Sequence, residues 1–239
     1  MLLYQKLLNS RHNDKPSLIG LLDPDKKNDI KKIKSQLDYI RERDFCAIFI
    51  GGSLIMDSKY VEKVEYIKNN SDLPLISFPS SAAQINKNFD AVLFLSLVSG
   101  RNPQYLIGEQ VISAPIVYDL QIEPIPVGYI LLDGGGKTSV EMISDTRALP
   151  MDNHDLIISH ALASQYLGHK FVYLECGSNA RQSIELGLLQ KLKKCIEVPI
   201  IVGGGIKSSD EILNIYNAGA DFVVLGTAIE ELMDLDKGN

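Results

Sequence analysis

The sequence is poor in cysteine and has no tryptophan, and its three cysteines (Cys46, Cys176 and Cys195) are scattered along 239 residues. Three separated thiols cannot build a disulfide framework and do not have zinc-site spacing, which favours a reducing compartment. No stretch approaches the ~18 apolar residues of a membrane span. The N-terminal stretch lacks the apolar run of ~7–15 residues found in signal peptides. These absences predict a cytoplasmic protein.

Positive charge is also in deficit, because 24 Lys and Arg residues face 30 Asp and Glu residues, giving a net charge of -6. This balance argues against a nucleic-acid groove or a basic membrane-binding face. An anionic substrate then has to be held by backbone amides, a metal ion or a few lysines. The four histidines show no metal-ligand spacing, and no Ser/His/Asp or Cys/His pattern is visible, so nucleophilic catalysis is not predicted.

Short apolar runs recur along the chain, and each is nearly continuous rather than alternating, the pattern of parallel strands buried on both faces. The predicted strands are Leu18–Asp23, Ala47–Gly51, Leu75–Phe78, Ala91–Leu95, Gly128–Leu132, Phe171–Glu175, Ile200–Gly203 and Phe222–Gly226. The predicted helices between them are Asp29–Arg43, Ser58–Asn69, His154–Leu167, Ala180–Lys194 and Ser209–Ala218.

This alternation, without a linker, predicts one α/β domain over residues 1–239, a single (β/α)8 barrel of the TIM type. An open, doubly wound sheet is the alternative. After the third strand, Pro79–Asn88 is short, so a loop is expected there in place of a helix. The stretch Ser113–Pro126 contains Pro115, Pro124 and Pro126 and is expected to be irregular.

In such a barrel the active site lies at the C-terminal ends of the strands. Asp23 ends the first strand, where a carboxylate is costly unless a cation or hydrogen bonds compensate it. Mg²⁺ bound to substrate phosphates meets that need, and a turn cap before Pro24 is the alternative. After the second strand, Gly51-Gly52-Ser53 permits close approach of a ligand or simply makes a tight turn.

The loop after the fifth strand reads Asp133-Gly-Gly-Gly-Lys137-Thr138 but is not a P-loop, because Leu131 stands where the first glycine is required. A phosphate-facing lid and a solvated glycine-rich loop both remain open.

Tyr173 and Glu175 are two residues apart on the sixth strand, so both side chains point to the same side. Inside the barrel, burial would raise the pKa of Glu175 and suit it to act as a general base, whereas a salt-bridged glutamate is the alternative. Gly-rich turns follow the seventh and eighth strands, at Gly203-Gly204-Gly205 and Gly226-Thr227. Their interval of ~20 residues is that of one β/α unit, and together they predict a phosphate site, with ligand-free turns as the alternative.

These motifs, in this order along nearly the whole chain, resemble the geranylgeranylglyceryl phosphate synthase family, and the most specific of them is Tyr173-Leu174-Glu175-Cys176-Gly177-Ser178. The resemblance implies a Mg²⁺-dependent transfer of a prenyl group, here geranylgeranyl, from its diphosphate to the 3-hydroxyl of sn-glycerol 1-phosphate. It implies Mg²⁺ at Asp23 and Ser53 and catalysis by Glu175 and Tyr173. The glycerol 1-phosphate site it implies consists of Tyr173, Leu174, Glu175, Cys176, Gly177, Ser178, Asn179, Gly204, Gly205, Gly226 and Thr227.

The sequence departs from that family at two positions: Leu21 stands where some relatives have lysine, and Thr227 where many have asparagine. Lys26, Arg101 and Lys137 are candidate diphosphate contacts, and Leu93–Val98 with Tyr105 and Leu106 are candidates to line a prenyl groove. We expect a homo-oligomer, no nucleic-acid partner, and a product that partitions to membranes. A phosphosugar isomerase or lyase, or a barrel that only binds a phosphorylated ligand, are the alternative functions.

Overall fold

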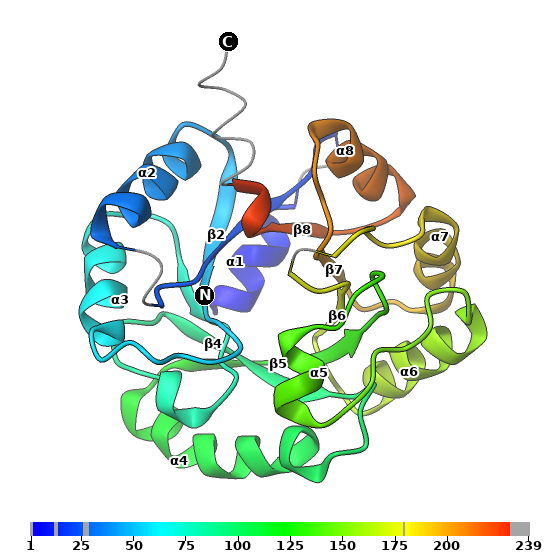
Figure 1. The fold of residues 1–239 in the computed structure, drawn as a ribbon, viewed down its shortest axis with the longest axis horizontal. Coiled ribbons are helices and arrows are strands. Elements are labelled where there is room, and N and C mark those ends of the chain that lie inside the picture. The colour runs from blue at the N-terminus through cyan, green and yellow to red at the C-terminus, as the bar shows by residue number, and fades with distance from the viewer. Residues whose placement is uncertain (1, 12–13, 26–28, 179, 230–239) are drawn as a thin grey trace.

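The computed structural model describes residues 2–11, 14–25, 29–178 and 180–229. Parallel strands pair in sequence order, and β8 pairs back with β1, so that the sheet closes into an eight-stranded barrel (Figure 1). The predicted barrel is therefore confirmed, and the open doubly wound alternative is wrong. The strands are β1 Leu18–Leu22, β2 Phe45–Ile50, β3 Leu75–Ser77, β4 Ala91–Leu97, β5 Glu123–Leu131, β6 Phe171–Glu175, β7 Ile200–Gly203 and β8 Phe222–Leu225.

Side chains alternate along each strand between the barrel interior and the layer beneath the helices. On β6, Phe171 and Tyr173 belong to the interior cluster, whereas Val172 and Leu174 belong to the outer one. Both clusters are buried, which explains why the strands read as continuous apolar runs.

The outer layer contains α2 Ile30–Arg41, α3 Tyr60–Asn69, α6 His154–Tyr166, α7 Leu186–Cys195 and α8 Ser209–Ala218, all of them predicted. The prediction started α7 six residues early, because residues 180–185 form a loop in which the amides of Arg181 and Gln182 donate to the carbonyl oxygen of Gly134. After β3 the chain makes only a short 3-10 turn, Ala82–Gln84, so the predicted replacement of a helix is confirmed.

The prediction of an irregular stretch at residues 113–126 is wrong, because these residues belong mostly to a helix and a strand. A π-helical turn, Gln104–Gly108, leads into α4, Glu109–Leu120, which includes Pro115 on its exposed face, where a freed carbonyl can bind water. In β5 the carbonyl oxygen of Pro126 points toward β6 and accepts from the amide of Lys170, just before β6. The missing N–H groups of Pro124 and Pro126 therefore lie on the β6 side, and pairing with β6 begins only after them, at Val127. Pairing of β5 with β4 needs none of these N–H groups.

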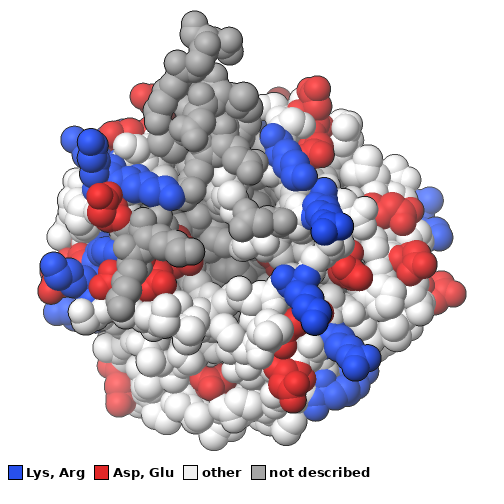
Figure 2. Space-filling model, viewed as in Figure 1, with Lys and Arg blue, Asp and Glu red and all other residues white. Residues whose placement is uncertain are grey.

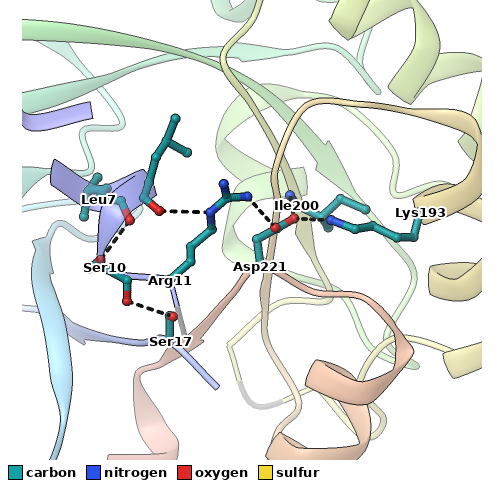
Figure 3. A network of polar contacts seen from close by, with 8 residues as sticks. Leu7, Ser10, Arg11, Ser17, Lys193, Ile200 and Asp221 are labelled. Atoms are coloured by element: carbon teal, nitrogen blue, oxygen red, sulfur yellow. Dashed lines mark hydrogen bonds and ion pairs between the residues drawn. The ribbon is translucent and has the colours of Figure 1, made fainter. Parts of the chain in front are cut away.

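The N-terminal end of the barrel is closed by α1, Leu3–Asn9, whose Leu3 and Leu7 join the interior cluster. Beside it the carboxylate of Asp221, just before β8, accepts from Arg11, Lys193 and the amide of Ile200 (Figure 3). This network ties α1, α7 and β7 together at the end opposite the predicted site, where its role is structural. Within the described ranges, no helix has the length and apolar character needed to cross a bilayer.

Candidate active site

A small pocket of about 60 Å³ opens at the C-terminal ends of β6, β7, β8 and β1. Its walls include seven of the predicted site residues: Tyr173, Glu175, Ser178, Gly204, Gly205, Gly226 and Thr227. The pocket therefore brings together the sixth-strand motif and the two glycine-rich turns, which lie far apart in sequence.

The carboxylate of Glu175 is buried at the base of this pocket. Its Oε1 accepts a hydrogen bond of 2.7 Å from the amide of Gly177. Burial raises the pKa of Glu175 to about 7, while the Gly177 amide and the nearby Tyr173 hydroxyl oppose the rise. No described lysine, arginine or histidine makes an ion pair with Glu175, so the salt-bridged alternative is not what the described residues show. A carboxyl with a pKa near 7 can accept a proton at neutral pH.

Tyr173 lies inside the barrel with its ring fully buried. The ring stacks on Phe78 with centroids 5.3 Å apart and meets Tyr129 edge-on. Among the described residues, no hydrogen bond of ordinary geometry reaches its hydroxyl oxygen. The hydroxyl lies close enough to the Glu175 carboxylate to lower the pKa of that group, and the aromatic packing holds it as a donor beside Glu175.

The turn after β7 forms a cradle of backbone. Gly204 and Gly205 have φ values of 85° and 71°, which favour glycine, and both residues line the pocket with their backbone. No hydrogen bond within the described ranges uses the amides of Gly204, Gly205 or Thr227. Helical conformation begins at Thr227, directly after Gly226. Unpaired amides in this arrangement bind anions.

The Asp23 carboxylate lies beside Gly52, at the neighbouring part of the barrel mouth. A Cβ atom at Gly52 would be 2.7 and 2.8 Å from its two oxygens, so only glycine allows this approach. The Gln84 side chain, from the 3-10 turn, holds the Gly52 carbonyl oxygen. Asp23 and Ser53 are partly or fully exposed. Among the described residues, no group of three or more His, Cys, Asp or Glu side chains is arranged to hold a metal ion.

A carboxylate, a hydroxyl and open access nevertheless fit a magnesium ion that takes its other ligands from water and substrate phosphate.

The matched family model is that described as the PcrB family, and it covers residues 10–237. The chain belongs to the PcrB family. A geranylgeranylglyceryl phosphate synthase from Flavobacterium johnsoniae is 40% identical over 95% of this chain and 93% of its own length. The Pyrococcus horikoshii protein of the same name is 37% identical over 98% of this chain and 91% of its own.

Among solved structures, the Thermoplasma acidophilum (S)-3-O-geranylgeranylglyceryl phosphate synthase, in complex with its substrate sn-glycerol-1-phosphate, is also similar to this PcrB-family chain. It has a TM-score of 0.90 and 28% identity, covering 98% of this chain and 95% of that one.

Not every predicted residue of the PcrB-family site presents its side chain to the pocket. Leu174 and Cys176 face the helical layer, so they can reach a ligand only through their backbone. Gly177 uses its amide to support Glu175. Ser178 is exposed at the pocket edge, and Leu21, the departure from the relatives' lysine, is a wall of the pocket. Asn179 and Lys26 lie outside the described residues.

Of the other candidates, Arg101 donates to the carbonyl oxygens of Gly100 and Val98 and contacts His160, while Lys137 is exposed on its loop. Leu95 and Tyr105 pack against the interior cluster. Sequence reasoning missed Lys207, which lines the pocket. Lys207 stands two residues after the triple glycine, at the end of a predicted anion-binding turn, and this position could have indicated its place in the pocket.

A larger open groove of about 1330 Å³ lies at the other end of the barrel, beside Leu2, α4 and the start of β5. Its walls carry the carboxylates of Asp90, Asp119 and Glu123. These would repel a phosphate, so the smaller pocket is the candidate site.

Proposed function

We propose that this chain transfers a prenyl group, geranylgeranyl in the first instance, from its diphosphate to the 3-hydroxyl of sn-glycerol 1-phosphate. The observation that carries the proposal is the juxtaposition of Glu175 with the unpaired amides of Gly204, Gly205 and Thr227 in one pocket. The names of the relatives and the glycerol 1-phosphate bound to the Thermoplasma protein support the choice of substrate.

The reaction forms a bond between the glycerol 3-oxygen and the first carbon of the prenyl chain and breaks the bond from that carbon to diphosphate. Glu175 accepts the proton of the hydroxyl as the oxygen attacks. The backbone amides hold the phosphate and thereby orient the hydroxyl toward Glu175. Tyr173 offers its hydroxyl as a donor inside the pocket.

We assign Mg²⁺ to Asp23 and Ser53. When bound, the ion neutralises charge on the departing diphosphate. Two observations bear on this assignment: Asp23 is exposed beside Gly52, and its Oδ1 accepts from the amide of Asp25 as a turn cap does.

An Asp23→Asn substitution is therefore expected to lower kcat/KM by about 10²-fold, the scale of one lost electrostatic contact in an active site. Removing divalent ions with EDTA is expected to abolish turnover of the wild type. The matched control is Asp25→Asn, because Asp25 accepts from the Met56 amide through one oxygen, which asparagine can do as well. Equal losses in the two variants, or full activity in EDTA, would argue against the assignment.

The overall function is tested by incubating the protein with Mg²⁺, labelled glycerol 1-phosphate and a ladder of prenyl diphosphates. The expected result is labelled phosphate that extracts into organic solvent, with one chain length preferred. If no prenyl length gives a product, the proposed function is wrong.

We also propose that the chain forms a homo-oligomer. The helix α4 exposes the apolar side chains of Val111, Ile112 and Tyr118, which are 64, 54 and 82% accessible. Exposed apolar surface on this scale marks interaction sites. Light scattering on the purified chain measures the assembly, and a monomer mass would overturn this proposal.

A further inference from the structure

Basic residues gather along one side of the barrel mouth. Lys137 and Arg147 flank α5 (Ser139–Ser144), Arg181 lies in the loop after β6 and Lys207 in the loop after β7. All four are exposed. Figure 2 shows Lys and Arg side chains in a row over these loops, on the right of the face. Contacts join the loops, because the Arg181 side chain packs on Gly135 and the Lys207 ammonium group donates to the Arg181 carbonyl oxygen.

Acidic residues beside this row are occupied by backbone amides. Asp133 accepts from the amide of Gly135, Glu141 from those of Thr138 and Ala148, and Glu211 from that of Lys207. Among the described residues, none of the four basic side chains forms an ion pair. At the opposite end, Arg11 and Lys193 are both paired with Asp221. The four cations are therefore free of direct ion pairs among the described residues, and Glu141, whose pKa is lowered, against the effect of burial, by backbone hydrogen bonds and by the Lys137 charge, is an acidic neighbour that interacts with the row.

Apolar side chains accompany the basic row. Met142 and Ile143 on α5 are 72 and 37% accessible and lie between Lys137 and Arg147 in sequence. Across the mouth, Leu54 and Met56 in the loop after β2 are 57 and 61% accessible. Cations beside exposed apolar side chains are the composition of a surface that binds at a lipid–water interface. Binding of a nucleic-acid backbone would require the basic residues but not these exposed apolar side chains.

We propose that this face, the basic row with Met142 and Ile143, docks the barrel mouth on an anionic lipid bilayer. Anionic lipids attract the four cations, and the two apolar side chains enter the interface. The pocket mouth then faces the membrane, where a prenyl substrate arrives and a prenylated product leaves. The location of this face does not depend on the proposed function. The advantage of delivering a prenyl substrate from the membrane does rest on the proposed function.

The absence of tryptophan from the chain allows a clean probe of docking. A Met142→Trp variant carries a single indole on the proposed face. Its fluorescence is expected to shift to the blue, and the protein to sediment, with vesicles containing equal amounts of phosphatidylglycerol and phosphatidylcholine. Vesicles of phosphatidylcholine alone are expected to bind weakly. Raising salt from about 0.1 M to 1 M shortens the Debye length from ~10 to ~3 Å and should release the protein.

Charge reversal tests the row without altering Lys137, a candidate diphosphate contact, or Lys207, which lines the pocket. An Arg147→Glu/Arg181→Glu variant is expected to bind anionic vesicles at least about 20-fold more weakly, since each basic residue near such a surface is worth about fivefold. The matched control is Lys170→Glu/Lys194→Glu, at the start of β6 and the end of α7, where both residues are exposed at the other end of the barrel.

Equal losses in the charge-reversal variant and the control would overturn the proposal, as would an unshifted indole. A DNA duplex provides a further test. If it binds as tightly as the vesicles do, and if Met142→Asn/Ile143→Asn weakens neither interaction, the row binds polyanions in general and the proposal of lipid docking is wrong. Because these measurements use no substrate, docking without prenyl transfer, or transfer without docking, separates this inference from the proposed function.

Discussion

Replacing Glu175 with glutamine is expected to reduce kcat for prenyl transfer by about 10²–10⁴-fold, the usual contribution of a general base. Glutamine has the same shape and can still accept the Gly177 amide through its oxygen, so the pocket should keep its form. It cannot take the proton of the glycerol hydroxyl. Binding of glycerol 1-phosphate is therefore expected to survive while turnover fails.

Steady-state rates for the product assay, together with calorimetric titration of glycerol 1-phosphate, separate these two effects. Glu185→Gln serves as the control, because Glu185 is exposed and, among the described residues, its carboxylate pairs with the His154 side chain away from the pocket. A Glu175→Gln enzyme with wild-type kcat would remove Glu175 as the base without altering the family assignment.

The elevated pKa of Glu175 also predicts two pH effects of opposite sign. Activity requires the ionised carboxylate, so kcat/KM should rise with pH and reach half its maximum near pH 7. Stability should fall over the same range. The folded protein holds the Glu175 proton to about pH 7, whereas the unfolded chain releases it near the ordinary glutamate pKa of 4.5. The stabilising contribution is thus complete below pH 4.5 and is lost as pH rises to about 7.

Urea unfolding of the wild type and of Glu175→Gln measures this cost. Between pH 4 and pH 8, the difference in unfolding free energy should move in favour of the variant by about 3 kcal/mol, from ~1.36 kcal/mol per pKa unit. A difference that does not change with pH would mean that Glu175 is not held in its neutral form by burial.

Strands and glycine turns could be predicted because each is encoded locally. A strand buried on both faces is a continuous apolar run, and Gly204 and Gly205 stand where only glycine adopts the required φ without strain. The helix α4 was missed because it carries Pro115 and is followed directly by Gln121, which takes the left-handed conformation that usually indicates glycine. Here tertiary packing overrides the local pattern.

Contacts between distant segments account for what the sequence did not reveal of the site. Period-2 spacing placed Tyr173 and Glu175 on one side of β6, and the structure puts that side inside the barrel. The same spacing points the Leu174 side chain away from the pocket, into the layer beneath the helices. Treating the whole motif as ligand-binding hides this difference between neighbouring residues. The support of Gly52 by Gln84 joins loops 32 residues apart and has no local pattern. The basic row is likewise invisible to a sum of charges, because its members belong to different loops.

The glycine at position 204 should be the least replaceable residue of the phosphate cradle. A Cβ there would lie 2.4 Å from Oε1 of Glu175 and 2.6 Å from the Gly177 amide nitrogen, between the two partners of the hydrogen bond that holds the base. The φ of 85° adds strain for any side chain. We expect Gly204→Ala to lower the free energy of unfolding by roughly 2–4 kcal/mol, from backbone strain and overpacking.

Activity of Gly204→Ala should fall by at least about 10²-fold, since a displacement of the base by about 1 Å suffices for such a loss. Chemical denaturation and the product assay measure the two effects. Gly136→Ala is the matched control, because no described atom beyond its chain neighbours lies within 4 Å of its added methyl group and its φ is not positive, so stability should stay within about 0.5 kcal/mol.

A Gly226→Ala substitution distinguishes an effect on phosphate binding from an effect on the stability of the fold. Among the described residues, the atoms nearest to its methyl group would be those of Leu21, at 3.6 Å or more, so the fold should tolerate it while a phosphate held by the neighbouring amides is displaced. The expected result is wild-type stability with a raised KM for glycerol 1-phosphate. Wild-type stability and activity in Gly204→Ala, or an unchanged KM in Gly226→Ala, would contradict a cradle built from these two turns, because a methyl group in either place has to displace the base or the phosphate.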